Sequence, residues 1–177
     1  MARSSTRWPR CPASSPARAE QRAPPVSGMT HQRVARRLYR LLDQAAIAAA
    51  APVETFTAVN VLVPDGLLIP DLVLVNAAAA AAAELTVNAD DIAAVVEIIS
   101  PTTEVSDRTL KPHLYAAGGI AHDWQVDLEP RTTIRFGELR HAAGGAYAEQ
   151  ALASSGETVR VERPFAFEID PAVLSRS

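Results

Sequence analysis

The sequence predicts a mixed α/β or α+β domain, and three observations support this class. Strand-forming segments alternate with one or two segments of helical period. The nearly continuous apolar run DDIAAVVEIIS is typical of a central strand that is covered on both faces. A chain of 177 residues, 48% of them hydrophobic, suits one compact domain plus a tail.

The first predicted element is an amphipathic helix that begins near Thr30, a residue suited to the N-cap. Its apolar stripe consists of Val34, Leu38, Leu41, Leu42 and Ala45. Another face carries four arginines, Arg33, Arg36, Arg37 and Arg40. Two interpretations of these arginines stay open: a solvated face, which is the more common case, or a contact with a phosphate backbone.

Sequence rich in strand formers follows this helix. VETFTAVNVLV and LLIPDLVLVN are predicted strands, and the turn PDG separates them. The alanine run of residues 77–83 fits either a helical turn or a low-complexity loop. The predicted central strand comes after it.

The second half contributes one short helix and several strands. The helix is predicted for residues 112–117, with Pro112 in its first turn and Gly118-Gly119 at its end. HDWQVDLEPRTTIRFGEL then predicts two strands joined by a turn at residues 129–131. YAEQALASSGETVRVERPFAFEID adds further short strands.

Composition excludes several kinds of site. The single cysteine, Cys11, rules out an internal disulfide and a zinc site built from cysteines. The longest apolar run is far shorter than the ~20 residues of a membrane span, so we expect a soluble protein of a reducing cytoplasm.

Residues 1–28 are predicted to form a disordered or non-native tail, and residues 29–177 the folded domain. The tail is rich in Pro, Ser, Ala and Arg and shows no apolar period. It also resembles a transit peptide, although the missing amphipathic repeat disfavours that interpretation. The net charge is −3 and the tail contributes +4, so the domain carries −7. Such a domain meets nucleic acid only through a local basic patch or a bound metal ion.

Glu97 is the most informative residue, because it lies inside the apolar run AAVVEIIS. A buried acid is costly unless it is paired or bound to a cation, so a core ion pair and a catalytic carboxylate both remain open. Asp71 opens the preceding strand, DLVLV. Lys111, the only lysine in the chain, follows at the edge of the next helix. Unlike arginine, lysine has a compact charge whose pKa its surroundings can shift.

These three side chains supply the groups that phosphodiester hydrolysis needs. Two carboxylates on neighbouring strands can hold Mg²⁺ or Mn²⁺ and leave positions for water and a phosphate. Such an ion polarises the phosphoryl group and lowers the pKa of bound water. A lysine beside the carboxylates stabilises developing charge or orients the attacking water.

The run from PDLVLVN to AAVVEIISPTTEVSDRTLKPHLYAAGGIAHDWQVD resembles the Uma2 family of endonucleases, within the restriction-endonuclease-like PD-(D/E)xK superfamily. The positions that carry the resemblance are Pro70-Asp71, Glu97, Ser100-Pro101, Asp107, Lys111, Tyr115, Gly119-Ile120, Trp124 and Asp127. PPVSGMTHQRVARRLYRLL also resembles the family's segment before its first long helix. The resemblance covers roughly residues 24–170, and the combined spacing is specific.

The resemblance implies a restriction-endonuclease-like α/β fold, a mixed sheet flanked by helices. It implies Mg²⁺- or Mn²⁺-dependent hydrolysis of DNA phosphodiester bonds in the cytoplasm, with Asp71 and Glu97 as metal ligands and Lys111 as the third catalytic residue. A homodimer, common among nucleases of this fold, stays an open option. The alternative function is a catalytically degenerate nucleic-acid-binding or interaction protein that keeps the fold.

Two departures from the family pattern affect the expected site. In the wider superfamily the lysine lies two residues after the glutamate, where this chain has Ile99. The resemblance implies that Lys111 takes over from the next helix, and Pro112 should hold it outside helical geometry. Family members also begin with a Tyr-Glu-x-x-x-Gly-like element whose acid joins the metal site. This chain offers only Glu20 there, so we expect two metal carboxylates instead of three and a lost or replaced first unit.

Neighbouring residues allow simpler interpretations. Asp107 either forms an i,i+4 pair with Lys111 or caps a turn. Tyr115 and Trp124 are predicted core residues, and His31 is a helix-terminal residue more readily than a phosphate contact. The other candidates receive no catalytic role: His113, His122, His141 and the turn residue Ser100.

Overall fold

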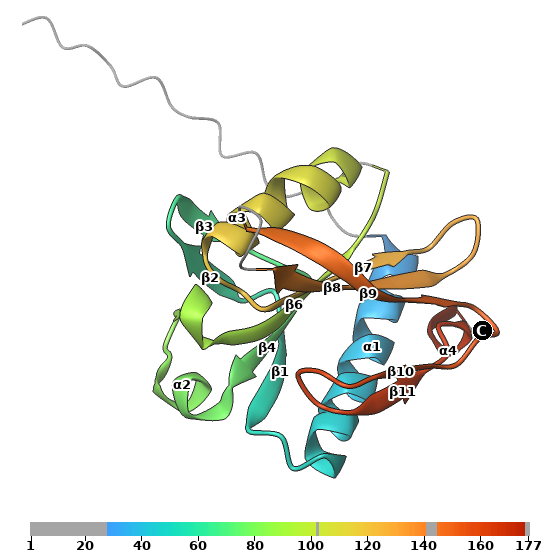
Figure 1. Cartoon of the computed structure of the whole chain (residues 1–177), viewed down its shortest axis with the longest axis horizontal. Helices are drawn as coiled ribbons and strands as arrows, with labels where there is room; N and C mark the ends of the chain where they lie inside the picture. Colours follow the sequence, from blue (N-terminus) through green and yellow to red (C-terminus); the bar gives the residue numbers. More distant parts are fainter. Residues whose placement is uncertain (1–27, 102, 141–144, 176–177) are drawn as a thin grey trace, which may run out of the picture.

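A six-stranded sheet with the strand order β1-β4-β6-β7-β8-β9 forms the centre of the molecule (Figure 1). The computed structural model describes residues 28–101, 103–140 and 145–175. The strands are β1 (Val53–Thr57), β4 (Leu72–Asn76), β6 (Ile92–Ile98), β7 (His122–Asp127), β8 (Thr133–Arg140) and β9 (Ala146–Ser154). Neighbours run antiparallel except β6 and β7, which are parallel. The predicted mixed sheet flanked by helices is confirmed.

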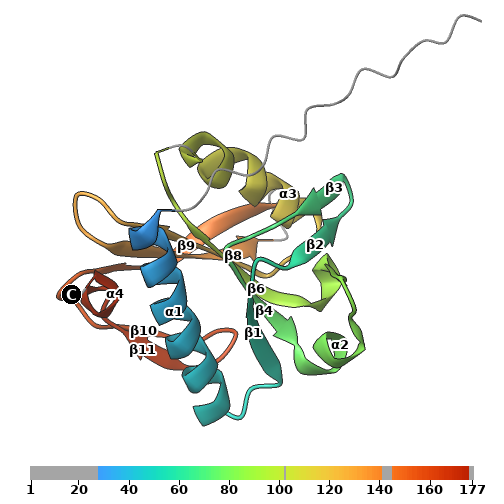
Figure 2. The same cartoon turned by 180° about the vertical axis from the view of Figure 1, so that it is seen from behind.

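One face of the sheet packs against helix α1 (Met29–Ala48), the hairpin of β10 (Val159–Val161) and β11 (Phe167–Ile169), and helix α4 (Ala172–Ser175). Figures 1 and 2 show α1, the hairpin and α4 next to one another. We call this the α1 face. The buried stripe of α1 is Val34, Leu38, Leu42 and Ala46, while Leu41 and Ala45 are only partly buried. The periodicity of the sequence therefore predicted the buried side of this helix well.

The start of α1 differs from the prediction. Gly28 is the N-cap, and Thr30 lies inside the first turn, where its side chain has no capping role. The Gly28 backbone is extended, and its carbonyl accepts from the Gln32 N–H at 3.1 Å. Any residue can adopt this extended geometry, and the preference for threonine at the cap is too weak to set the boundary.

The other face of the sheet packs against the helical segments η2 (Ser106–Leu110) and α3 (Lys111–Ala117). A small sheet joins them there, made of β3 (Gly66–Leu68), β2 (Asn60–Val63) and β5 (Thr86–Asn88) in the order β3-β2-β5. The 3-10 turn η1 (Ala89–Asp91) and helix α2 (Ala77–Ala82) connect these strands to the main sheet. We call this the α3 face. Its core includes Val61, Val73, Val95, Tyr115 and Ile120.

Three segments of the first half resolve questions that the sequence left open. VETFTAVNVLV forms two strands, because the backbone turns at Ala58, whose φ is +53°. The alanine run forms α2, and the Asn76 side chain caps it by accepting from the N–H groups of Ala78 and Ala79. The apolar run forms β6, a central strand as predicted.

The helix around Lys111 corrects the prediction. Helical structure begins at Ser106, and Lys111 itself has helical φ and ψ of −61° and −44°. The expectation that Pro112 would hold Lys111 outside helical geometry is therefore wrong. The preceding turn is a wide π-type turn, in which the Lys111 N–H donates to the Ser106 carbonyl five residues back. This irregularity makes room for a proline ring that would strike a carbonyl in a regular helix.

The predicted strands of the second half are confirmed as β7 to β11. Within the described ranges, no helix is long and apolar enough to cross a membrane.

Candidate active site

Asp71 and Glu97 meet at one end of the sheet. The last paired residues of β4 and β6 are Leu72 and Val96, so Asp71 and Glu97 follow them as neighbours on adjacent strands. Leu72 and Val96 point into the α1 face, and side chains alternate along a strand. Asp71 and Glu97 therefore belong to the α3 face. The Ile98 N–H donates to Asp71 Oδ2 at 2.7 Å and holds this carboxylate against β6.

His31 approaches Asp71 from the start of α1. Its Nε2 lies 3.1 Å from Asp71 Oδ2, and its side chain is mostly buried. The hydrogen bond to Asp71 is the main reason that the pKa of His31 is raised. The sequence predicted only a helix-terminal histidine, because no local signal links residues that are 40 positions apart.

The carboxylate of Glu97 is fully buried, with 1% of the residue exposed. Lys111 Nζ lies 3.0 Å from its Oε2, and the Tyr115 hydroxyl donates to its Oε1 at 2.5 Å. Lys111 Nζ also lies 2.8 Å from Asp107 Oδ1. The structure thus has the i,i+4 pair of Asp107 and Lys111 and a core ion pair of Glu97. Tyr115 is buried as predicted, but its hydrogen bond to Glu97 was missed.

Burial and charge act against each other in this cluster. Burial raises the pKa of Glu97 to about 8, although Lys111 and the Tyr115 hydrogen bond oppose the shift. Burial also acts to lower the pKa of Lys111, but the acids Glu97 and Asp107 outweigh it and raise that pKa. The site therefore holds a cationic lysine beside a glutamate whose charged form burial disfavours.

Arg108 anchors the helical segment over this cluster. Its guanidinium forms a two-pronged ion pair with Asp127 at the end of β7 and contacts Glu104 at 3.1 Å. Asp127 is one of the positions that carry the family resemblance, and no role was predicted for it. The contact fixes η2 to the sheet one turn ahead of Lys111.

Two buried polar residues of β7 were also missed. Gln125 lies across from Glu97 in the parallel pair of β6 and β7, and Asp123 lies across from Val95. Gln125 Nε2 donates to Asp123 Oδ2 at 3.1 Å. Burial raises the pKa of Asp123 to about 7. Both side chains line a hollow of about 310 Å³ beside the predicted site.

The donor set fits a divalent cation only in part. Among the described residues, no group of three or more His, Cys, Asp or Glu side chains is arranged to hold a metal ion. Asp71 and Glu97 are hard oxygen donors on adjacent strands, and Mg²⁺ often takes one or two carboxylates and completes its shell with water and substrate phosphate. The two carboxylates are therefore of the kind that Mg²⁺ or Mn²⁺ binds, but among the described residues they lack a third such ligand.

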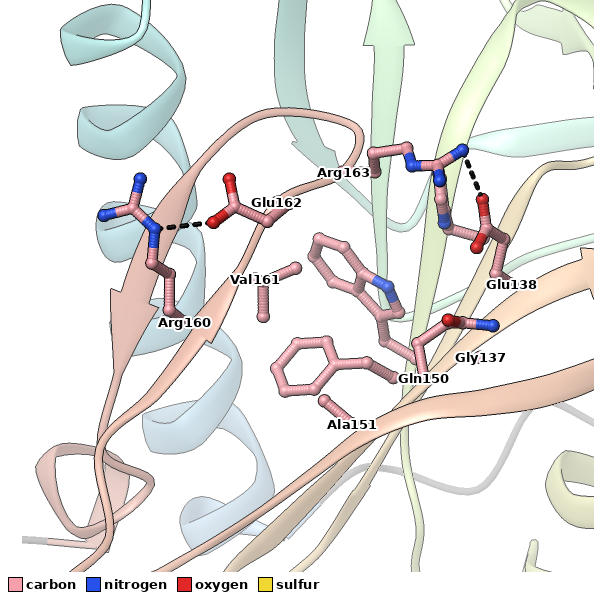
Figure 3. A pocket seen from close by; sticks show the side chains of 11 residues that line it. Gly137, Glu138, Gln150, Ala151, Arg160, Val161, Glu162 and Arg163 are labelled. Carbon is pink, nitrogen blue, oxygen red and sulfur yellow. Dashed lines mark hydrogen bonds and ion pairs between the residues drawn. The ribbon is translucent and has the colours of Figure 1, made fainter.

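A separate hollow of about 220 Å³ lies on the α1 face (Figure 3). Trp124 and Phe136 line it, along with ion pairs of Arg163 with Glu138 and of Arg160 with Glu162. His122 also lines it, and burial lowers the pKa of that histidine. None of the three predicted site residues lines this hollow.

The remaining predicted residues lie away from the cluster. Trp124 is a core residue, as predicted, and Ser100 forms a turn with Thr103. Arg37 donates to the Leu174 carbonyl at 2.8 Å, so it has a structural contact. The other three arginines of α1 are exposed: Arg33, Arg36 and Arg40. His113 lines the hollow of β7, and His141 lies outside the described residues.

Comparison with known proteins decides the family. Residues 19–173 match the model of Uma2, described as "Putative restriction endonuclease". The chain belongs to the Uma2 family. The resemblance that the sequence motifs carried is thus confirmed, and no curated protein matches the chain.

A solved structure shares this fold. The Uma2 chain is similar to the crystal structure of a "putative nuclease belonging to DUF820" from Anabaena variabilis ATCC 29413. The TM-score is 0.62 at 15% identity, over 85% of this chain and 82% of the other. At this identity the likeness concerns the fold.

Both departures that the sequence shows, one from the wider superfamily and one from the Uma2 pattern, bear on the site. Ile99, at the position of the superfamily lysine, is buried, so the cation beside Glu97 comes from α3. The segment that should hold the Tyr-Glu-x-x-x-Gly-like element lies outside the described residues.

Proposed function

We propose that residues 29–177 form a metal-dependent endonuclease that hydrolyses DNA phosphodiester bonds. Asp71 and Glu97 are its metal ligands, and Lys111 is its catalytic cation. The observation that supports the proposal is that the fold brings Asp71, Glu97 and Lys111 together. Asp71 neighbours Glu97 on adjacent strands, and Lys111 Nζ lies 3.0 Å from Glu97 Oε2. Membership of a nuclease family supports hydrolysis of nucleic acid.

Lys111 stabilises the negative charge that develops on the phosphoryl group. Asp107 and Glu97 both lie within 3.0 Å of its amino group and keep it cationic and oriented. The Tyr115 hydroxyl fixes the rotamer of Glu97, and the Ile98 N–H fixes that of Asp71. Lys111 and Asp71 keep 19% and 24% of their side chains exposed, so a phosphate can reach both side chains.

A Mg²⁺ or Mn²⁺ ion held by Asp71 and Glu97 supplies Lewis acidity toward the phosphoryl oxygens. His31 and Lys111 already contact the Oδ2 and Oε2 atoms of these two ligands. We therefore expect weak metal binding, with a dissociation constant roughly in the high micromolar to millimolar range.

The test is plasmid nicking. Supercoiled plasmid is incubated with the protein and Mg²⁺ or Mn²⁺, beside Glu97→Gln, Lys111→Ala and the control Asp90→Asn, which removes an exposed acid outside the cluster. Circular dichroism checks that each variant folds. We expect nicking that needs the ion and falls at least about 100-fold in both site variants, but persists in Asp90→Asn. Nicking that survives in both site variants, or no nicking by folded wild type, contradicts the proposal.

One observation favours a second function, a non-catalytic nucleic-acid-binding protein. Both oxygens of Glu97 already have partners in Lys111 and Tyr115, as in a closed structural ion pair. This function predicts that Glu97→Gln leaves plasmid affinity and folding unchanged and that Mn²⁺ binding is undetectable by electron paramagnetic resonance.

A further inference from the structure

The outward face of α1 carries three cations that the proposed hydrolysis does not use. Arg33, Arg36 and Arg40 are exposed, and because they follow one another at i, i+3 and i+7 they share one face of the helix. This face lies opposite the buried stripe that begins with Val34 and Leu38. We call Arg33, Arg36 and Arg40 the arginine stripe. Figure 2 shows α1 in front of the sheet, along the outside of the molecule.

Ion pairs neutralise most other cations of the domain but not the arginine stripe. Among the described residues, the cations that pair with acids are Arg108, Lys111, Arg135, Arg160 and Arg163. No ion pair within the same ranges includes an arginine of the stripe. Outside α1, the other exposed arginines without an ion pair in the described part of the chain are Arg131 and Arg140, near opposite ends of β8. The stripe is therefore a concentrated positive surface on an otherwise acidic domain.

The arginine stripe does not favour the helix that carries it. Arg33 with Arg36, and Arg36 with Arg40, are like-charge neighbours at i,i+3 and i,i+4, and such pairs destabilise a helix. The first turn of α1 contains no acid, so no carboxylate offsets the positive end of the helix dipole near Arg33. Folding therefore gains nothing from these charges, whereas a polyanionic partner would relieve their repulsion.

The dimensions of the stripe fit a phosphate backbone. Because α1 rises about 1.5 Å per residue, Arg33 and Arg40 are about 10 Å apart along its axis. One DNA strand carries a phosphate roughly every 3.4 Å along the duplex axis, so the stripe spans about three phosphates. A membrane surface fits less well, because the apolar side of α1 packs against the sheet and is not free to insert into lipid.

The helix begins at the proposed active site. His31 in its first turn lies 3.1 Å from Asp71, and the stripe starts two residues later, at Arg33. His31 faces the sheet, whereas the stripe faces solvent on the other side of the helix. The stripe is therefore placed to contact DNA that flanks the scissile bond, and not the scissile phosphate itself.

We propose that Arg33, Arg36 and Arg40 bind backbone phosphates of the substrate DNA beside the cleavage site. The inference rests on the proposed function, because it takes DNA as the substrate. Phosphate contacts carry no direct sequence information, so the stripe contributes affinity that is independent of sequence and decreases as salt increases. It also supplies the local basic patch that an acidic domain needs in order to meet nucleic acid.

The test measures binding of the full chain to a fluorescein-labelled DNA duplex of about 30 bp in EDTA. Fluorescence anisotropy gives the dissociation constants from about 50 to 200 mM KCl. The stripe variant is Arg36→Gln/Arg40→Gln, and the matched control Arg131→Gln/Arg140→Gln removes the same charge at other exposed arginines. We expect the stripe variant to bind at least about tenfold more weakly and to reduce the slope of log affinity against log salt by about 2. The control should lose less than about threefold in affinity.

Thermal unfolding separates this effect from a structural one. Because the stripe variant loses a like-charge pair, it should unfold at no lower temperature than wild type. The single variant Arg40→Gln disturbs the helix least and should reduce the salt slope by about 1.

Three outcomes overturn the inference: a wild type that does not bind the duplex, equal losses of affinity in the stripe variant and its control, or an unchanged salt slope in the stripe variant. Vesicles of phosphatidylserine and phosphatidylcholine test the other anionic surface. Vesicle binding that the stripe variant loses, while its DNA affinity stays the same, would assign the stripe to a membrane.

The nicking assay separates failure of this inference from failure of the proposed function. Nicking by a protein whose salt slope does not depend on the stripe removes only the inference. A salt slope that depends on the stripe, without nicking, removes only the proposed catalysis.

Discussion

The two faces of the central sheet use the same strands for different purposes. On the α1 face, β6 and β7 present Val96, Ile98 and Trp124 to an apolar core. On the α3 face, the alternate positions of the same strands include Glu97 and Asp123, both buried. A strand period of two thus separates a core that stabilises the fold from a row of acids beneath a short helix.

The two faces differ in the energetic cost of the side chains that they bury. Buried acids need partners. On the α3 face, Glu97 obtains them from Lys111 and Tyr115 of α3, and Asp123 obtains one from Gln125 of β7. The α1 face needs no such partners. We therefore expect substitutions on the two faces to differ in kind as well as in size.

The largest expected effect comes from the α1 face. Leu42 is 0% exposed, and Leu42→Ala should lower the free energy of unfolding by about 3–5 kcal/mol, because it leaves a cavity. Urea denaturation followed by circular dichroism measures the loss. The control Leu62→Ala, at a residue that is 40% exposed, should cost less than about 1 kcal/mol. Equal losses would show that the α1 face is not the main source of stability.

The next largest loss of stability is expected when Lys111, the cation of the α3 face, is replaced. Lys111→Met leaves Glu97 and Asp107 buried without their shared partner and should cost about 3 kcal/mol. The double variant Lys111→Met/Glu97→Gln should regain at least half of this loss, because one of the two acids left without the cation is replaced by a neutral amide. A double-mutant cycle in urea measures the coupling. Additive losses would contradict the ion pair.

Asp123, the buried acid of β7, should make the free energy of unfolding depend on pH. The folded pKa of Asp123 is raised to about 7 from an ordinary 3.8, so between these values the folded state binds more protons than the unfolded state. Its contribution is therefore present at low pH and lost as pH rises toward 7. Relative to wild type, Asp123→Asn should gain about 2 kcal/mol more stability at pH 8 than at pH 5. Paired urea titrations check this gain, and a pH-independent difference would argue against the shift.

The smallest effect tests a polar contact beside the α1 face. Arg37→Met removes the hydrogen bond to the Leu174 carbonyl and should cost about 1 kcal/mol. Arg36→Met, at an exposed neighbour, should cost nothing measurable. Thermal unfolding of both variants checks the difference. A larger loss of stability for Arg36→Met would show that the exposed arginines of α1 also stabilise the fold.

Sequence reasoning succeeded where the physics is local or the spacing is specific. The period of α1 predicted its buried stripe, and the apolar run of β6 predicted a central strand. The motif spacing selected Asp71, Glu97 and Lys111, and the fold brings their segments together. The prediction that Pro112 would hold Lys111 outside helical geometry was wrong, because a wide turn absorbs the constraint that the proline imposes.

The sequence by itself therefore determined the family, the fold class and the candidate acids, since periodicity and motif spacing are written along the chain. Only the tertiary structure decided which groups those acids contact. His31 reaches Asp71 from 40 residues away, Tyr115 reaches Glu97 from the next helix, and Asp123 has a buried oxygen beside a hollow. Such contacts depend on strand register and helix placement. These arise from the packing of the whole domain, so no local pattern of residues encodes them.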